Sequence, residues 1–534
     1  MDKKQIVNII NFVRAVDPPE GEFETMKNQM DICRELGLRA TFLFEYDAMS
    51  NLKFMKYAKR HEKFFEFGIW IEITRGNVLA AGETWRGRDQ DWDSHGKICN
   101  HTGYDPEARK RLVDAGMNKF KELFGYYPKA AGAWAIDAAT LKYMADKYGI
   151  SAACNCKEQW GTDGYSLWGG YYGQAYYPSV YNSLCPAQDE SAQINVPVFR
   201  MLGSDPVYQY DAGLDLSGGA AWHQPVITLE PAYTGAEGGG GVPAWIDWFF
   251  KENFNGKCLS FGYVQAGQEG FPWKQIQLGF KYQMQKIKEL CDKGDLELMT
   301  LSRAGEWYKK QYRLSPPSAI SADSDWLGQG RKSYWYCCKN YRINLYFEKG
   351  LFWIRDFYLY DQNYKERYLT EASKTDGYIF DCLPVMDGNR FSKNGVRAGL
   401  YPCGGDGGET AASGEPVWKE IDGAAVITVP TDKFGEIKFT FAEGGPSVSV
   451  KRNGGGFALA ARVPKDFGAT AAARDLSGEL RFEAGVKDAK NLSFTYNGFS
   501  YGLNLTSGAA CRGKQNELLI RAENGIIAAI PKKQ

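Results

Sequence analysis

Residues 1–310 alternate short runs of β-forming residues with amphipathic helical segments, and this alternation constrains the fold more than any other feature of the sequence. Helical patterns such as 22–36, 106–124 and 138–148 separate the runs. Such an order is typical of parallel strands joined by helices. It predicts an α/β fold, with a β/α-barrel of about seven or eight strands over residues 1–312. The candidate strands are 6–13, 40–44, 67–73, 130–136, 150–155, 196–201, 226–229, 258–264 and 296–301.

The pattern changes near residues 315–324. Beyond them, short alternating runs such as 342–347 and 424–429 are separated by turns rich in Gly, Asp and Asn, which is typical of an all-β, sandwich-like region. A chain of 534 residues also exceeds what one hydrophobic core holds. We therefore expect a barrel domain at 1–312, a β-rich domain at 313–405 and a β-sandwich-like domain at 406–534.

The charges of the chain balance. Lys and Arg together number 64, as do Asp and Glu, so there is no net field to attract nucleic acid or an anionic membrane. The 15 Trp and 32 Tyr are many, and several lie in Gly-rich segments. Aromatic faces that stack on sugar rings would explain them, and so would a Tyr-rich core. A neutral carbohydrate partner fits this composition.

The N-terminal segment has a short apolar run, but neither the long apolar region nor the cleavage site of a secretory signal. No apolar run approaches the length of a membrane span. The 12 cysteines are then expected to be reduced thiols rather than a disulfide framework. Together these features predict a cytoplasmic protein with a carbohydrate substrate and no nucleic-acid or membrane partner, and they leave its oligomeric state open.

Carboxylates follow many of the candidate strands. The ends of barrel strands converge on one mouth, where active sites are built. Paired carboxylates in such a place suit glycosidic cleavage, because one donates a proton to the leaving oxygen and the other attacks the anomeric carbon or activates water. Each acid alone is more often a helix cap or a loop ion pair. The strand-end acids are Glu45, Asp47, Glu72, Asp137, Asp205, Glu230 and Glu269.

Aromatic and polar residues flank these acids and predict where sugar hydroxyls and ring faces would bind. A loop after the strand at 150–155 combines an acid, small residues and aromatics, which favours binding. The expected substrate-binding residues are Arg14, Glu45, Trp70, Glu72, His95, Trp134, Asp163, Trp168, Tyr233 and Gln268.

In the order of its elements, the segment 5–310 resembles the superfamily of barrels that includes polysaccharide deacetylases and the glycoside hydrolases of families 38 and 57. In family 57, the fourth strand carries a Trp-x-x-acid motif whose acid is the nucleophile. Trp134-Ala-Ile-Asp137 is similar to it, with Asp in place of the usual Glu. The stretch from Cys154 through Glu269 also resembles a bacterial group of unknown function.

The resemblance implies a glycosidase that retains the anomeric configuration, with Asp137 as nucleophile and Glu230 as general acid/base. Asp205 and Glu269 are reserve candidates for the second role. The chain departs from the family at the first strand, where Asn11-Phe-Val-Arg14 replaces a His-x-His motif.

Two alternatives stay open. A metal-dependent polysaccharide or amino-sugar deacetylase would need a cation, for which Asp93, His95 and His101 are possible ligands, although their spacing is not that of a helical His pair. A non-catalytic carbohydrate-binding protein would keep the barrel without its chemistry. We expect no cofactor and no metal, because Arg14 places a cation where a deacetylase needs anionic ligands.

Overall fold

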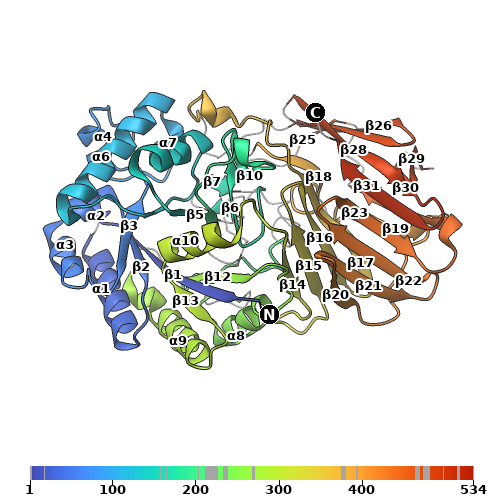
Figure 1. Cartoon of the computed structure of the whole chain (residues 1–534), viewed down its shortest axis with the longest axis horizontal. Coiled ribbons are helices and arrows are strands. Elements are labelled where there is room, and N and C mark those ends of the chain that lie inside the picture. Colours follow the sequence, from blue (N-terminus) through green and yellow to red (C-terminus); the bar gives the residue numbers. More distant parts are fainter. Residues whose placement is uncertain are drawn as a thin grey trace.

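The computed structural model describes residues 3–16, 19–156, 159–162, 165–167, 169–201, 204–210, 227–232, 238–267, 271–374, 381–392, 395–405, 407–463, 470–472, 481–496, 498–513 and 517–532. In these ranges a sheet flanked by helices is followed by antiparallel sheets, which confirms the expected fold class. Figure 1 shows the two parts side by side, the barrel in blue to green and the β region in olive to red.

The barrel is built on a nine-stranded sheet with the order β12-β1-β2-β3-β4-β5-β11-β8, in which β13 also pairs with β1. These pairs are parallel except that of β11 with β8. β11 and β12 lie in contact, so the sheet curves round and its parallel strands open on one mouth. The bounds are β1 (Gln5–Val13), β2 (Thr41–Phe44), β3 (Glu66–Trp70), β4 (Ala130–Gly132), β5 (Ala152–Cys156), β8 (Ala175–Tyr176), β11 (Val198–Met201), β12 (Gly262–Ala266) and β13 (Glu297–Met299). Two small two-stranded sheets follow β5, one of β6 (Gln159–Thr162) and β7 (Tyr165–Leu167) and one of β9 (Pro178–Ser179) and β10 (Asn182–Pro186).

Helices alternate with these strands, and their ends follow local sequence signals. The side chain of Asp105 accepts the first free N–H groups of α6, Pro106 occupies the first turn, and Gly125 ends the helix with φ 82°. The helices expected at 106–124 and 138–148 are confirmed. The bounds are α1 (Pro19–Glu35), α2 (Tyr46–Ser50), α3 (Leu52–Lys59), α4 (Arg75–Ala80), α5 (Gly96–Cys99), α6 (Pro106–Phe124), α7 (Ala138–Tyr148), α8 (Pro243–Asn253), α9 (Trp273–Asp292) and α10 (Leu301–Gln311).

Several expected strands differ from the structure in their bounds, and two of them differ most. The strand predicted at 130–136 ends at Gly132, and residues 133–136 connect it to α7. The strand predicted at 226–229 is not formed by its described residues, 227–229. There Thr228 makes only an isolated bridge with Ser204.

The β region consists of two nine-stranded antiparallel sheets packed on a shared apolar core. Strands from both sides of residue 405 share the first sheet, and the predicted domain boundaries at 312 and 405 remain predictions. The first sheet contains β14 (Ser318–Ala322), β15 (Lys332–Cys337), β16 (Tyr341–Glu348), β17 (Leu351–Leu359), β18 (Leu383–Asp387), β19 (Gly399–Gly404), β24 (Phe457–Arg462), β29 (Ala509–Arg512) and β30 (Leu518–Arg521). The second contains β20 (Val417–Ile421), β21 (Ala424–Thr431), β22 (Gly435–Ala442), β23 (Gly445–Val450), β25 (Thr470–Ala472), β26 (Arg481–Asp488), β27 (Asn491–Tyr496), β28 (Phe499–Ser507) and β31 (Ile526–Pro531).

The barrel and the β region share a hydrophobic core. Trp335, Trp353, Tyr358 and Tyr401 of the first β sheet belong to the same buried cluster as the barrel strands and helices. Tyr172 from the barrel side stacks on Trp335, with ring centroids 3.7 Å apart. The β region is therefore packed against the barrel and is not a free appendage.

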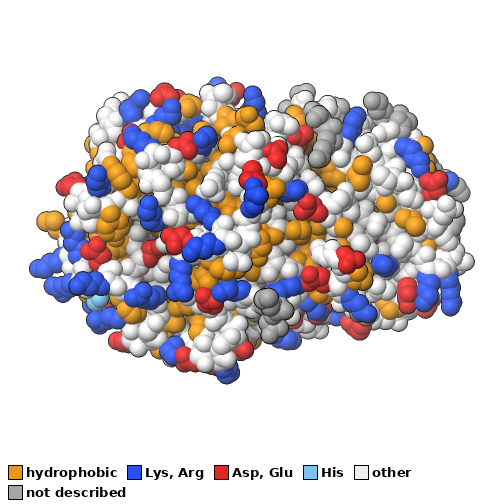
Figure 2. Space-filling model, viewed as in Figure 1, with side chains coloured by type: hydrophobic (Ala, Val, Ile, Leu, Met, Phe, Trp, Pro, Cys, Tyr) orange, Lys and Arg blue, Asp and Glu red, His pale blue; other side chains and the backbone are white. Residues whose placement is uncertain are grey.

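The surface carries mixed charges. On the face drawn in Figure 2, lysines and arginines alternate with acidic side chains over both parts of the molecule. In the part of the chain that the structure describes, no helix combines the length and the apolar character needed to cross a bilayer.

Candidate active site at the mouth of the barrel

The ends of β1, β2 and β3 bring three ionisable residues together. Arg14 follows β1, Glu45 follows β2, and Glu72 lies just past β3. The Nε atom of Arg14 lies 3.3 Å from Glu72 Oε2, and the backbone N–H of Ala15 donates to Glu45 Oε2 over 3.3 Å. Neighbouring parallel strands end at the same edge of the sheet, which is why residues so far apart in sequence meet here.

Glu72 is held from several sides. The indole N–H of Trp70 donates to Glu72 Oε2 over 2.9 Å, and that of Trp92 donates to Oε1 over 2.7 Å. With the guanidinium of Arg14, these donors fix the position of the carboxylate. Trp70 in turn stacks on Phe12, with ring centroids 4.1 Å apart, and meets Trp134 edge-on at 5.2 Å.

Burial, rather than contact with donors, dominates the environment of Glu22 and Glu45. Burial raises the pKa of Glu22 to about 7, against the opposing charge of Arg14 and a hydrogen bond from the Val16 N–H. Burial also raises the pKa of Glu45 well above its usual range, and the charge of Glu72 adds to this effect. Glu22 is 8% exposed and Glu45 is fully buried, so Glu22 is the more accessible of the two.

Asp137, the predicted nucleophile, is enclosed. Its side chain caps α7 by accepting the N–H and the hydroxyl of Thr140, and it pairs with His101 Nε2 at 2.8 Å and Arg109 Nη1 at 3.4 Å. Burial alone would raise the pKa of Asp137, but the hydrogen bond and charge of His101, with Arg109, lower it to about 2. These contacts are those of a buried helix cap. The assignment of Asp137 as nucleophile stays a prediction.

A residue of the β region joins this cluster. Glu366 accepts the N–H of Ala138 at the start of α7, over 2.7 Å, and the N–H of Ser183 over 2.8 Å. Burial raises the pKa of Glu366 to about 8, and the nearby charge of Asp137 adds to the shift. Two carboxyl groups thus share one helix N-terminus, one from each part of the molecule.

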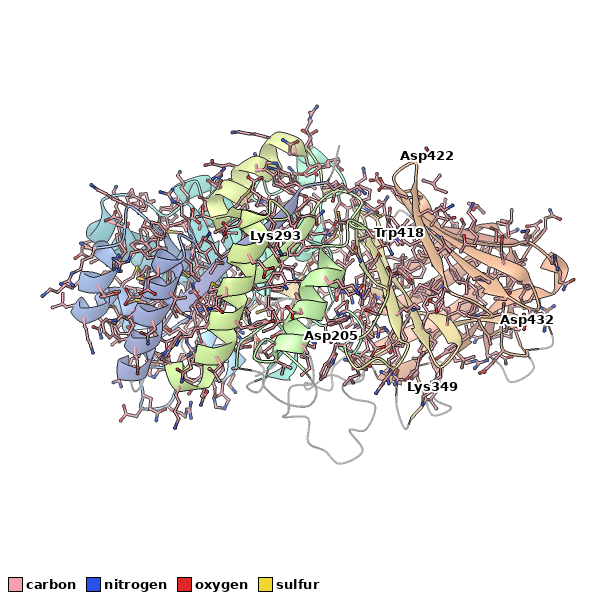
Figure 3. All side chains as sticks on the ribbon, turned by 90° about the horizontal axis from the view of Figure 1, so that it is seen from below. Asp205, Lys293, Lys349, Trp418, Asp422 and Asp432 are labelled. Carbon is pink, nitrogen blue, oxygen red and sulfur yellow. The ribbon has the colours of Figure 1, made fainter. Side chains whose placement is uncertain are left out.

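Asp205 lies at the junction between the barrel and the β region, where Figure 3 labels it. It accepts the N–H groups of Val207 and Tyr208 and, over 3.0 Å, the indole N–H of Trp245 in α8. Burial raises the pKa of Asp205 to about 6, against these hydrogen bonds. Glu230 is also buried, and its N–H donates to Thr228 Oγ1 over 3.2 Å.

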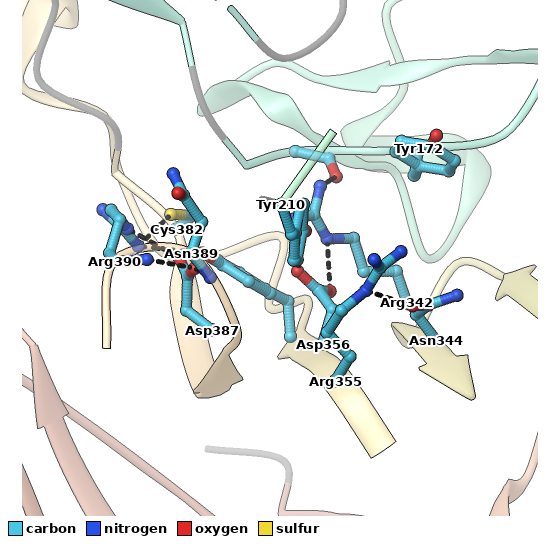
Figure 4. Close-up of polar contacts among 12 residues, drawn as sticks. Tyr172, Tyr210, Arg342, Asn344, Arg355, Asp356, Cys382, Asp387, Asn389 and Arg390 are labelled. Carbon is cyan, nitrogen blue, oxygen red and sulfur yellow. Dashed lines mark hydrogen bonds and ion pairs between the residues drawn. The ribbon is translucent and has the colours of Figure 1, made fainter. Parts of the chain in front are cut away.

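The β region holds the segment that carries Asp205. Arg355 of β17 donates to the carbonyl of Val207 over 2.7 Å and to that of Pro206 over 3.0 Å. Tyr210 donates to Asp356, which also forms a buried ion pair with Arg342 at 2.9 Å (Figure 4). The chain that leaves β11 is therefore fixed by side chains of the β region.

The other predicted binding residues are placed as follows. Trp70 and Trp134 are buried in the wall of the mouth, and the half-exposed His95 side chain pairs with Asp93. The backbone of His95 leads into α5. Asp163, Trp168, Tyr233, Gln268 and Glu269 lie outside the described residues.

The suggested metal ligands pair with neighbouring side chains. Asp93 pairs with His95 and Arg88, whereas His101 is buried against Asp137. In the described part of the chain, no group of three or more His, Cys, Asp or Glu side chains could hold a metal ion.

Two residues of this site were not predicted as functional from the sequence, Glu22 and Trp92. Glu22 lies in the first turns of a helix and looks like an ordinary surface acid in the sequence. Trp92 lies in a loop between α4 and α5, in an acidic stretch, and only its position beside Arg14 and Glu72 distinguishes it. The sequence signal for Glu22 was its place at the start of a helix that closely follows the first strand.

No protein-family model matches the chain, and no curated protein does. A crystal structure of a protein of Parabacteroides distasonis, provisionally described as a glycoside hydrolase/deacetylase, is similar with a TM-score of 0.50 and 15% identity, over 73% of this chain and 90% of that one. A provisional polysaccharide deacetylase of Mycobacterium smegmatis is similar with a TM-score of 0.36 and 15% identity, over 59% of this chain and 93% of that one. A family 57 branching enzyme of Thermococcus kodakaraensis is similar with a TM-score of 0.28 and 10% identity, over 58% of this chain and 72% of that one. The first of these comparisons shows that the chain shares its overall fold with the Parabacteroides distasonis protein.

Proposed function

We propose that this protein is a glycoside hydrolase whose proton donor is Glu22 and whose fixed negative charge is Glu72. The observation that carries the proposal is the contrast between these two carboxyl groups at one barrel mouth. Burial holds the pKa of Glu22 at about 7, whereas Arg14 and two indole N–H groups hold Glu72 as an ion pair. Carboxyl groups with environments this different divide acid and base roles in glycosidases.

In this mechanism Glu22 donates a proton to the glycosidic oxygen as the bond to the anomeric carbon breaks. A pKa near neutrality suits that step, because the acid is both present in its protonated form and strong enough to transfer the proton. The charge of Glu72 stabilises the oxocarbenium character that develops on the sugar. Water then adds to the anomeric carbon and gives up a proton to the Glu22 carboxylate, which restores the acid. Arg14 pairs with Glu72, and its charge also limits how far the pKa of Glu22 rises.

The test is a comparison of variants on a panel of 4-nitrophenyl glycosides. Glu22→Gln removes the acid with little change of shape, and we expect kcat/KM to fall by about a hundredfold or more. The matched control is Glu24→Gln, an exposed position two residues further along the same helix, which we expect to behave as the wild type. In the wild type, kcat/KM is expected to decrease above about pH 7, as Glu22 loses its proton.

Acetate release from an acetylated polysaccharide is measured beside glycoside cleavage, with and without EDTA. We expect chelation to leave glycoside cleavage unchanged, because neither proposed carboxyl role uses a metal. Acetate release that EDTA abolishes, without glycoside cleavage, would make the protein a deacetylase. Full glycosidase activity in Glu22→Gln, with loss in Asp137→Asn, would return the catalytic role to the pair predicted from the sequence, Asp137 and Glu230.

A further inference from the structure

Trp92 contacts both members of the Arg14–Glu72 ion pair at the mouth. Its indole N–H donates to Glu72 Oε1 over 2.7 Å, and the guanidinium carbon of Arg14 lies 4.9 Å from its ring centroid. We propose that Trp92, with its ring fixed by Arg14 and Glu72, is the platform on which the ring of a neutral pyranose sugar stacks at the barrel mouth. This inference rests on the proposed function and assigns the residue that binds the sugar.

Exposure separates Trp92 from the other tryptophans of the mouth. Trp70 is 1% exposed and Trp134 is 7% exposed, and both pack on Phe12. Trp92 is partly exposed instead. Of these three rings, Trp92 is the one with surface to offer to a ligand. The guanidinium of Arg14 covers one face of the indole, and the proposal assigns the opposite face to the sugar.

Hydrogen bonds of the two residues next to Trp92 fix the loop that carries it. The side chain of Asp93 accepts the N–H of Arg88 over 2.9 Å and the N–H of His95 over 2.9 Å, and it also pairs with the imidazole of His95. The carbonyl of Asp91 accepts the N–H of Arg75, the first residue of α4, over 2.8 Å. A ring held in this way loses little conformational entropy when a ligand binds.

The chemistry of the position favours a neutral sugar. An indole face offers apolar contact to the C–H groups of a pyranose ring, and the adjacent Arg14 and Glu72 offer a donor and a carboxylate to its hydroxyls. Arg14 is already neutralised by Glu72, so the position has no free cation to select an anionic sugar. The whole chain has 64 basic and 64 acidic residues, so its net charge does not attract a charged sugar.

The experiment uses the full chain and the 4-nitrophenyl glycoside that it cleaves best. Trp92→Ala removes the platform, and we expect KM to rise roughly tenfold with a smaller change in kcat. Trp92→Phe keeps an aromatic face and is expected to retain most of the affinity. Trp85→Phe is the matched control on the same loop, since its indole N–H donates to the Arg88 carbonyl over 2.7 Å and not to Glu72. It is expected to leave KM unchanged.

A direct binding measurement accompanies the kinetics. Titration with the free monosaccharide of that glycoside should quench tryptophan fluorescence in the wild type and in Trp85→Phe, and this quenching should be lost in Trp92→Phe. Thermal melting of each variant confirms that it is folded. If Trp92→Ala and the wild type have equal KM values while activity still depends on Glu22, Trp92 is not the sugar-binding platform and the proposed function still stands. If Glu22→Gln leaves kcat/KM unchanged, the proposed function itself is contradicted.

Discussion

Single carboxylates in this protein take their roles from their neighbours. Glu22 and Asp137 are both nearly inaccessible acids close to the start of a helix. Burial dominates at Glu22 and moves its pKa to about 7. At Asp137 the contacts with His101 and Arg109 outweigh burial and lower the pKa to about 2. The first arrangement suits proton transfer near neutral pH, and the second suits a permanent charge that stabilises the fold.

Asp137→Asn is therefore expected to lower the free energy of unfolding by about 3–5 kcal/mol, because it breaks a buried ion pair and leaves Arg109 and His101 without their carboxylate. Chemical denaturation at pH 7 measures this change. The matched control is Asp146→Asn in the same helix, whose exposed pair with Lys142 should contribute less than about 1 kcal/mol. A variant as stable as the wild type that has lost several orders of magnitude in activity would instead support Asp137 as the nucleophile.

At the scale of elements, residues 366–373 connect the β region to the helices of the barrel. Glu366 binds the first N–H of α7, and Arg109 of α6 donates to the carbonyls of Tyr368 and Glu371. The N–H of Ser373 donates to the carbonyl of Thr102 over 2.7 Å. The N-terminus of α7 thus depends on a segment that lies more than two hundred residues later in the chain.

This contact predicts a pH dependence of stability. In the unfolded chain Glu366 titrates near 4.5, and in the folded protein its pKa is about 8. The folded state therefore holds more protons between these values, so the contribution of Glu366 to stability is complete below about pH 4.5 and is lost as the pH rises to about 8. We expect Glu366→Gln to make the melting temperature depend less on pH in this window. Glu371→Gln, an exposed position of the same segment, is the control and should keep the wild-type slope. A wild-type slope in Glu366→Gln would contradict the prediction.

At the scale of the whole molecule, the barrel and the β region form one packed unit. The buried cluster of the barrel includes Trp335 and Trp353 of the β region, and Arg355 holds the segment after β11. Separating the parts would expose these aromatic surfaces and leave buried polar groups unpaired.

A chain truncated after residue 312 is accordingly expected to be insoluble, or soluble without a cooperative melting transition. Expression of the fragment and circular dichroism of any soluble product test this expectation. Limited proteolysis of the full chain is the companion measurement, and it should not release a barrel that keeps activity. A soluble fragment with a sharp transition and full glycosidase activity would show that the barrel folds and works alone.

Local signals in the sequence were enough for the fold class and for many elements of the barrel. Asp105, Pro106 and Gly125 mark both ends of α6, and the alternation of runs predicted a barrel followed by an all-β region. Glu45 and Glu72 could be placed at the mouth because the ends of adjacent parallel strands must meet. These features depend on hydrogen bonds and periodicities that lie within a few residues of one another.

The tertiary structure alone decided which acids are enclosed, which are accessible and what each contacts. Glu22 reaches the mouth because α1 packs back beside β1, and Trp92 does so because its loop lies over Arg14. Glu366 meets Asp137 across 229 positions of the chain, as their numbers show. A pKa and a role in catalysis depend on burial and on charges a few ångströms away, and no local pattern in the sequence specifies either.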